Sequence, residues 1–524
     1  MRRHLNILLS AAVLARLLLQ VLAMPPYAGL DEAYHVARVA FVAREGREPG
    51  AGEPSIPRYL ARSMGGAVGA PPAFGVIAAR WPEAVAALPE GFADVPLSRG
   101  DTGDYLSANY EAQQPSLYYE LAALLDRAAG STQLRELLGL RLLAALLGVL
   151  TALATGLLAA RLAGPAGFLA GLLLASTPTW IALVARAGND ALACAALALA
   201  LLLSTRSRET WSSRLAEAAC WAAATASKLT TWPAALLLPL LWPEGATRKR
   251  RWLVAVSILA AAVLTVLDLS ERTSTPVGQQ GLAEQLRLGG DGWLGRLAAM
   301  PWGSFLKLWA AQALWTSGQH GNFVRPLGLA ILLAPWLLLA TAAVDAPAPS
   351  RRSLRVLIAA AVLFALSQAA HAYGFLREAA ALGLPQPRAG FEGWYVHTFD
   401  PLWFGLGLGA LLAAPARRGR LLLALGTLGV LAADVFLHEG ALFRDYAGLS
   451  SPQTPDLFFR WGGGGVWAAL ERLRLYGLGL PSAWLAVGLR LTHLAAALLI
   501  VRCLWHRGDR LRQVSGDPVC WPSR

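Results

Sequence analysis

Long apolar runs recur along almost the whole of this 524-residue chain. A helix that spans a bilayer needs ~20 consecutive, mostly apolar residues. Runs close to that length occupy residues 5–23, 140–160, 166–184, 189–204, 213–227, 229–243, 252–268, 327–344, 354–371, 399–414, 421–437 and 482–502. The pattern predicts an all-α polytopic membrane protein with about twelve transmembrane helices, within a range of about 10–14.

The composition excludes the other broad classes of protein. The chain is 56% apolar and only 15% charged, whereas soluble domains have roughly 45–50% apolar and about 25% charged residues. No Cys-x-x-Cys spacing occurs among the four cysteines, so neither a zinc site nor a disulfide framework is predicted. Arg outnumbers Lys 43 to 3 and Ala and Leu dominate, which indicates a bacterial source with a GC-rich genome.

The charged residues predict the orientation in the membrane. With a cytoplasmic N-terminus, the inner segments are 1–4, 161–165, 205–214, 244–251, 345–355, 415–420 and 502–524. They hold 21 basic and 5 acidic residues, and the rest of the chain holds 25 basic and 28 acidic ones. This asymmetry follows the positive-inside rule and puts both termini in the cytoplasm. It also explains the net charge of +13 without a nucleic-acid partner.

The external loops are much longer than the internal ones. Residues 24–139 separate the first two spans, and 269–326, 373–398 and 438–481 lie on the same face. Within these loops, residues 115–126 and 466–477 have an apolar face at helical spacing but are too short to span. We expect both to be helices on the membrane surface, and the functional site to face outward.

A charged residue inside the first apolar run needs a partner. Arg16 must pair with an acid or face a polar cavity, and both Asp190 and an outward-facing cavity are open to it.

An acid pair and a histidine follow the first span directly. If residues 31–43 are helical, Asp31 and His35 share a face and Glu32 turns aside. A carboxylate at this position can act as a general base at the membrane surface. It could instead be a helix N-cap, because Asp is a favoured capping residue.

Three further polar features stand out, one in the first external loop and two near predicted span ends. The cluster 109–115 precedes the surface helix, and Arg186, Asn189 and Asp190 open another span, where the Asn and Asp could again be caps. Lys228 lies between two apolar runs. It could snorkel to the interface or offer its charge to an anionic headgroup.

The order of these pieces resembles the GT-C class of membrane glycosyltransferases, which take sugar from a polyprenyl-phosphate carrier and include the protein mannosyltransferase and aminoarabinose transferase families. The matching pieces are Asp-Glu-Ala-Tyr-His at 31–35, Tyr-Glu-Ala-Gln-Gln-Pro-Ser-Leu-Tyr-Tyr at 110–119, the Arg-led run from 141, Asn-Asp at 189–190 and Ala-Ser-Lys-Leu-Thr at 226–230. They cover residues 1–245. Further on, Trp394 stands where relatives often carry the arginine of Gly-Arg-Tyr, so Arg388 or His397 would have to contact the phosphate.

The resemblance implies a GT-C fold with a catalytic module, 1–245, and a C-terminal module, 246–524. It implies an inverting transferase in the bacterial cytoplasmic membrane, moving a sugar from a polyprenyl-phosphate donor to a glycan, lipid or protein acceptor. Asp31 would be the base, Glu32 would orient the acceptor or, with Asp31, hold Mg²⁺ or Mn²⁺, and His35 would bind the sugar or phosphate. Arg186 and Lys228 would hold the leaving phosphate. The other residues expected to bind substrate are Tyr34, Gln114, Arg141, Asn189, Asp190, Arg388, Tyr395 and His397.

Three other functions are consistent with a polytopic chain. A flippase for lipid-linked sugars would use intramembrane charges as a pathway, although the long first loop argues against it. A GT-C-like scaffold without activity is a second alternative, because Trp394 replaces an arginine that relatives often carry. A glycan ligase or polymerase is disfavoured, because such proteins do not begin with an acid pair after the first span.

Overall fold

The computed structural model describes a helical framework and a few short connecting segments. The described residues are 2–23, 31–50, 53–57, 60, 105, 109–129, 133–206, 209–243, 246–272, thirteen positions between 334 and 366, 397–409, 412, 417–441 and 482–514. The regular secondary structure within these ranges is helical apart from one isolated bridge, between Pro57 and Tyr105. The predicted all-α class is therefore confirmed for this part of the chain.

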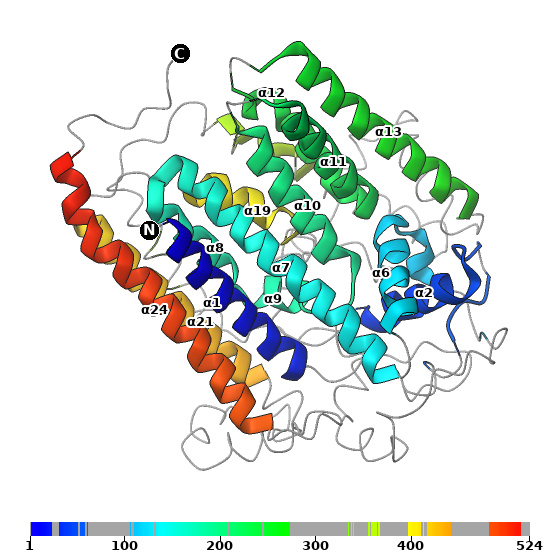
Figure 1. The fold of residues 1–524 in the computed structure, drawn as a ribbon, viewed down its shortest axis with the longest axis horizontal. Coiled ribbons are helices and arrows are strands. Elements are labelled where there is room, and N and C mark those ends of the chain that lie inside the picture. Colours follow the sequence, from blue (N-terminus) through cyan, green and yellow to red (C-terminus); the bar gives the residue numbers. More distant parts are fainter. Residues whose placement is uncertain are drawn as a thin grey trace, which may run out of the picture.

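Two long antiparallel helices pack side by side on one flank of the structure. They are α1 (Arg2–Ala23) and α24 (Ser482–Val514), with α21 (Arg417–Ala441) beside them (Figure 1). Arg16, late in α1, binds Asp434 of α21 at 2.8 Å, and Asp434 also binds Arg490, early in α24, at 2.7 Å. The expectation that Arg16 pairs with an acid is confirmed, but its partner is Asp434 of α21 and not Asp190.

The centre of the structure is α7 (Gln133–Ala163), which contacts α1 on one side and α10 (Asn189–Ser204) on the other (Figure 1). A short turn, η3 (Gly164–Gly167), leads into α8 (Phe168–Leu174), which folds back against α7. A Cβ on Gly171 of α8 would lie 2.4 Å from the carbonyl oxygen of Ala152. Glycine is therefore needed for this close helix approach.

The predicted span 166–184 is broken in the structure. After α8 the chain turns and begins α9 (Pro178–Val184), with Thr177 in an extended conformation. A residue before proline is disfavoured in the helical region, so Pro178 starts a new helix rather than extending the old one. The next helix, α10, is bent by 111° from α9. Residues 185–188, which include Arg186, form this bend and lead into the first turn of α10.

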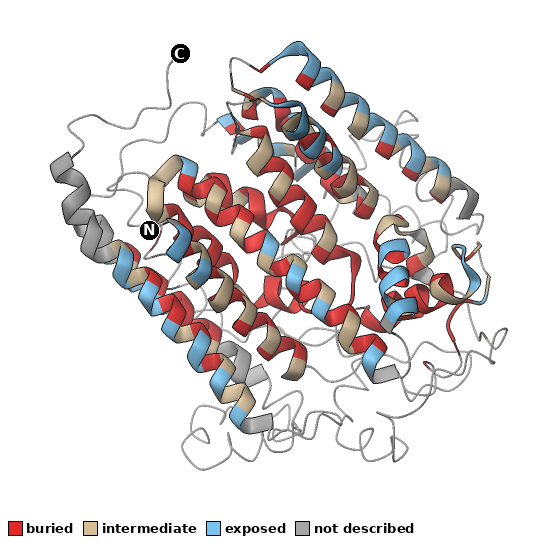
Figure 2. Ribbon diagram, in the orientation of Figure 1, coloured by how far each residue is buried: buried red, intermediate tan, exposed pale blue. Residues whose placement is uncertain are grey.

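The chain after α10 forms a hairpin that is also interrupted. Helix α11 (Trp211–Ser227) ends at Lys228, whose backbone is extended, and η4 (Leu229–Leu237), α12 (Leu238–Leu241) and α13 (Arg248–Arg272) follow. The predicted runs 213–227 and 229–243 are thus separate elements. Many large apolar side chains of α13 are exposed, which suits contact with lipid (Figure 2).

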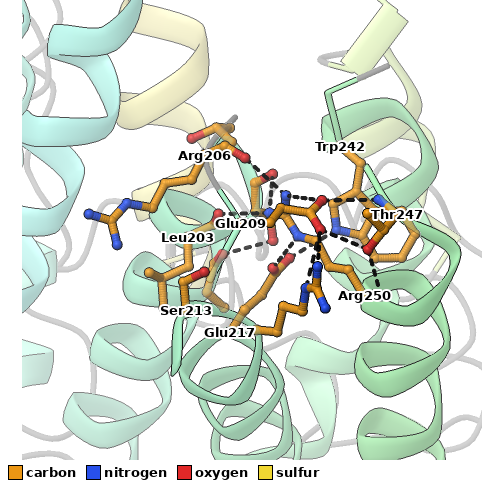
Figure 3. A network of polar contacts seen from close by, with 12 residues as sticks. Leu203, Arg206, Glu209, Ser213, Glu217, Trp242, Thr247 and Arg250 are labelled. Carbon is orange, nitrogen blue, oxygen red and sulfur yellow. Dashed lines mark hydrogen bonds and ion pairs between the residues drawn. The ribbon is translucent and has the colours of Figure 1, made fainter. Parts of the chain in front are cut away.

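Arg250 ties together one end of this hairpin. Its guanidinium binds Glu217 at 2.6 Å and donates to the carbonyl oxygens of Leu203 and Arg206 at 2.9 Å (Figure 3). A cation at these carbonyls satisfies acceptors that the end of α10 leaves open. This clasp lies at the opposite end of α10 from Asn189.

Two predicted non-spanning helices are present. Helix α2 (Glu32–Glu45) matches the expected helix 31–43, and η2 (Tyr110–Gln113) leads into α6 (Leu117–Ala129), which matches 115–126. Helix α6 packs on α2 through Tyr118, Tyr119, Ala122 and Ala123. A location of α6 on the membrane surface stays a prediction, and the expected helix 466–477 lies outside the described residues.

Four described helices are long and apolar enough to cross a membrane, or five if α9 and α10 together form one broken span. They occupy 3–22, 135–174, 248–269 and 484–504, and the second of these stretches runs through α7, η3 and α8. The expected run 327–344 lies largely outside the described residues, and in 354–371 the ten described positions are helical. In 399–414 the structure has α19 (Asp400–Leu402) and a π-helical turn, η6 (Trp403–Leu408). The count of twelve and the division at residue 245 remain predictions.

Candidate active site

The predicted site residues converge at one end of the helical framework. Helices α2 and α6 lie against each other beside the start of α10, and α6 also contacts α10 and α11 (Figure 1). The end of α11 joins them because Asn189, the first residue of α10, donates to the carbonyl oxygen of Ser227 at 3.1 Å. Residues 31–35, 109–119, 186–190 and 227–228 therefore share one region.

Asp31 has an unusual backbone conformation. Its φ is 54° and its ψ is 8°, and it is the one non-glycine residue with positive φ in the described part of the chain. It stands at the N-cap position of α2, yet its side chain makes no capping hydrogen bond. The capping interpretation is therefore wrong. Left-handed backbone outside glycine carries strain, and such strain is concentrated at functional sites.

The neighbouring acid, Glu32, is fully engaged in a buried ion pair. Arg141 donates to its two carboxylate oxygens at 2.8 and 2.6 Å, and the backbone N–H of Ala187 donates to Oε1 at 3.0 Å. Arg141 also donates to the carbonyl oxygen of Val21, at 3.1 Å. These contacts tie the end of α1, α2, α7 and the segment before α10 together. Asp31 and Glu32 consequently do not fit a metal site, because a cation would have to displace Arg141.

A buried three-residue charge cluster lies at the start of α10. Arg186 donates to Oδ2 of Asp190 at 2.6 Å, and the ammonium of Lys228 binds Oδ1 of the same carboxylate. The N-cap of α10 is Gly188, without a side-chain cap, so the capping interpretation of Asn189 and Asp190 is also wrong. Lys228 is buried rather than extended to the interface. Two cations and one carboxylate leave this cluster with a net positive charge.

Glu111 is a site residue that the sequence prediction missed. It is buried, its Oε2 lies 3.5 Å from Nδ1 of His35, and the hydroxyl of Tyr119 donates to the same oxygen at 3.3 Å. Burial, followed by the charge of Asp31, raises the pKa of Glu111 to about 8. Its position inside the polar cluster 109–115, just before an amphipathic helix, was the available signal.

His35 lies between Tyr119 and the cationic cluster. Its Nδ1 is 2.7 Å from the Tyr119 hydroxyl. Burial, followed by the charges of Arg186, Lys228 and Arg38, holds the pKa of His35 well below its ordinary value. The imidazole is therefore neutral at pH 7 and acts as a hydrogen-bonding group, not as a cation.

Arg38 and Asn109 hold the η2 turn in place. Arg38 donates to the carbonyl oxygens of Glu111 at 2.5 Å and Gln114 at 2.9 Å, and its guanidinium stacks 3.7 Å from the centre of the Tyr119 ring. The Asn109 side chain donates to the carbonyl of Tyr34 at 2.7 Å and accepts from the Glu111 N–H at 3.0 Å.

The remaining predicted residues are distributed around this centre. The side-chain oxygen of Gln114 accepts a hydrogen bond from Asn189 at 3.4 Å. Tyr34 is buried on α2, and this burial, followed by the charge of Asp31, raises its phenol pKa to about 12. His397 pairs with Asp400 at 2.7 Å, and its carbonyl oxygen is 3.7 Å from the sulfur of Cys194, one turn after Asp190. Arg388 and Tyr395 lie outside the described residues.

The described residues contain no group of three or more His, Cys, Asp and Glu side chains placed to hold a metal ion. The electrostatic neighbours of Arg186 are instead the carboxyl groups of Asp190, Asp31, Glu111 and Glu32. The site is thus a set of paired and partly paired charges around Asp31 and Arg186.

No protein-family model matches the sequence, and no curated protein matches it. Among solved structures, the chain is similar to the crystal structure of ArnT from Cupriavidus metallidurans bound to undecaprenyl phosphate. The two chains are 18% identical, the match covers 94% of this chain and 76% of ArnT, and the TM-score is 0.42. A likeness of this degree assigns no role to any residue of this chain.

Proposed function

We propose that this chain is an inverting glycosyltransferase of the GT-C class. It moves a sugar from a polyprenyl-phosphate carrier to a cell-envelope acceptor at the outer face of the bacterial cytoplasmic membrane. The observation that carries the proposal is Asp31: a carboxylate on strained backbone, released from capping, beside a buried cluster with net positive charge. The order of motifs from 31 to 230 supports the same class.

Asp31 supplies the base. As the acceptor hydroxyl attacks the anomeric carbon, its proton passes to the Asp31 carboxylate, the new C–O bond forms, and the bond from the anomeric carbon to the phosphate oxygen breaks. Direct displacement inverts the configuration at that carbon. The side chain is partly exposed, so an acceptor can reach it. General-base catalysis by a positioned carboxylate contributes about 10²–10⁴ in rate.

Arg186 and Lys228 stabilise the leaving group. A phosphodiester becomes a phosphate monoester dianion when the sugar departs, so negative charge develops on the carrier phosphate. Preorganised cations in a buried site stabilise such charge without reorganisation. Asp190 holds both cations through separate oxygens, which positions them and leaves the cluster with one net positive charge.

A lipid-linked donor fits the location of the site. The cationic cluster lies at the ends of apolar helices, where the phosphate of a carrier can sit while its isoprenoid tail stays in the bilayer. A nucleotide-linked donor would need a phosphate-binding loop between a strand and a helix, whereas the Gly-x-Gly-x-x-Gly match at 290–295 falls in the predicted external loop 269–326 and follows no predicted strand. The acceptor is a glycan, lipid or protein of the cell envelope.

The test is transfer by purified protein in lipid nanodiscs. Polyprenyl-phosphate sugars and cell-envelope extract are added, and free polyprenyl phosphate is measured by mass spectrometry. The enzyme is expected to release carrier, and Asp31→Asn to release none above background. Movement of intact lipid-linked sugar across liposomes without release would indicate a flippase, and neither activity with any donor would indicate an inactive scaffold; both results overturn the proposal.

A further inference from the structure

We propose that Glu111, Tyr119 and His35 form a hydrogen-bonded chain that sets which ring nitrogen of His35 carries the proton. Glu111 is then a positioning residue, acting on the site through His35. This inference rests on the proposed function for its consequence, but the chain itself is a property of the folded protein.

The contacts define the order of the chain. The Tyr119 hydroxyl is 2.7 Å from Nδ1 of His35 and 3.3 Å from Oε2 of Glu111. It has one proton, so it can donate to one of these two neighbours at a time. All three side chains are buried, which keeps water from supplying alternative partners and makes an unsatisfied group costly.

Two proton arrangements satisfy the chain. When Glu111 is protonated, it donates to the Tyr119 oxygen, Tyr119 donates to Nδ1 of His35, and the histidine proton lies on Nε2. When Glu111 is ionised, Tyr119 donates to Glu111, Nδ1–H of His35 donates to the Tyr119 oxygen, and Nε2 becomes an acceptor. The charge on Glu111 therefore reverses the direction of every hydrogen bond in the chain.

Neutral pH favours the first arrangement. The pKa of Glu111 is raised to about 8, and burial raises that of Tyr119 well above its ordinary value, so both hold their protons at pH 7. The charged and titratable groups facing Glu111 are Asp31 at the N-cap of α2, Tyr34, His35 and Arg38 from α2, Tyr119 from α6, Arg186 before α10 and Lys228 after α11. The three cations lower the pKa of Glu111, but burial and Asp31 outweigh them.

The far edge of His35 lies next to the cationic cluster. A Cβ on Gly188 would lie 3.2 Å from Cδ2 of His35 and 3.3 Å from the guanidinium carbon of Arg186. The Cδ2–Nε2 edge of the imidazole is thus on the Arg186 side. With its proton on Nε2, His35 offers a donor beside Arg186, suited to a phosphate or sugar oxygen; with Nε2 bare, it repels one.

The experiment is nitrogen-15 NMR of the eight histidines in protein labelled at the imidazole, with His35→Gln to assign the signal. The wild type is expected to show the Nε2–H form at about pH 6–7 and the Nδ1–H form above about pH 9, one unit past the Glu111 titration. In Glu111→Gln the amide donates to Tyr119 at every pH, so the Nε2–H form should persist. In Tyr119→Phe the dependence on Glu111 should weaken, because only the direct 3.5 Å contact between Nδ1 of His35 and Oε2 of Glu111 remains.

The inference would be overturned if the His35 tautomer of the wild type did not change between those pH values. It would also be overturned if Glu111→Gln showed the tautomer change expected of the wild type. No sugar donor is present, so this result does not depend on the proposed function. In the transfer assay, the donor KM of the wild type should rise about tenfold from pH 7 to pH 9, because the protonated fraction of Glu111 falls by about that factor. In Glu111→Gln the KM at pH 9 should be nearly equal to the KM at pH 7. If the expected tautomers are observed but no transfer is detected, the proposed function fails and the inference about His35 stands.

Discussion

Arg141 of α7 donates hydrogen bonds to both carboxylate oxygens of Glu32, at 2.8 and 2.6 Å, in a buried ion pair that joins α2 to α7. The two residues are 109 positions apart, and both were expected to serve the substrate. Their mutual contact, completed by the Ala187 N–H, instead anchors the backbone on which Asp31 stands. Of the two adjacent acids, Asp31 is therefore the one left available for chemistry.

Removing Glu32 should destabilise the protein. Glu32→Ala leaves the guanidinium of Arg141 buried without its carboxylate, and breaking a buried ion pair from one side costs about 3–5 kcal/mol. Thermal unfolding in detergent should show a clear fall in Tm, with a smaller fall in the double variant Glu32→Ala, Arg141→Met. Glu120→Ala, at an exposed acid of α6, is the control. Loss of transfer at unchanged Tm in Glu32→Ala would mean that Glu32 is catalytic.

Asp31→Asn should abolish transfer without unfolding the protein. Asn is nearly isosteric and tolerates the left-handed backbone that residue 31 adopts, but it cannot accept the proton. We expect a loss of about 10²–10⁴ in kcat, measured as carrier release, with Tm unchanged.

Asp31→Gly separates the backbone from the carboxylate. Glycine adopts positive φ without strain, so this variant should be at least as stable as the wild type and equally inactive. Near-normal turnover in either Asp31 variant would assign the residue a purely structural role.

Lys228→Met should weaken donor binding more than it slows the reaction of bound donor. Arg186 still neutralises Asp190 in this variant, but the cluster loses its net positive charge. The phosphodiester of the donor is already anionic when it binds, so the loss of this charge weakens binding of the ground state too and should raise KM more than it lowers kcat. Lys249→Met removes an exposed lysine of α13 and serves as the matched control. An unchanged KM with a collapsed kcat would indicate that Lys228 acts only in the transition state.

The orientation can be tested by labelling intact cells. In a background without the four native cysteines, Leu97→Cys should react with a membrane-impermeant thiol reagent, because the stretch 24–139 is predicted to be external. A protease-sensitive tag at the C-terminus should be protected until the membrane is opened. The reverse pattern would place the site on the cytoplasmic side and exclude the proposed reaction at the outer face.

The sequence alone determined the features that depend on local composition. Apolar runs predicted α1, α7, α13 and α24 as long helices because a run of about twenty apolar residues leaves few other ways to satisfy its backbone in lipid. Helical spacing likewise predicted α2 and α6. The motif from 31 to 35 marked the candidate site before any contact was known.

Tertiary structure alone decided which polar groups are free to react. Asp, Glu, Arg and Lys carry the same charge wherever they occur, and their roles depend on partners brought from distant segments. Arg141 occupies Glu32, Asp190 gathers Arg186 and Lys228, and Glu111 reaches His35 through Tyr119. The pairing of Arg16 with Asp434, 418 positions away, could not be predicted for the same reason: a buried charge needs some partner, but only the packing of the helices determines which one.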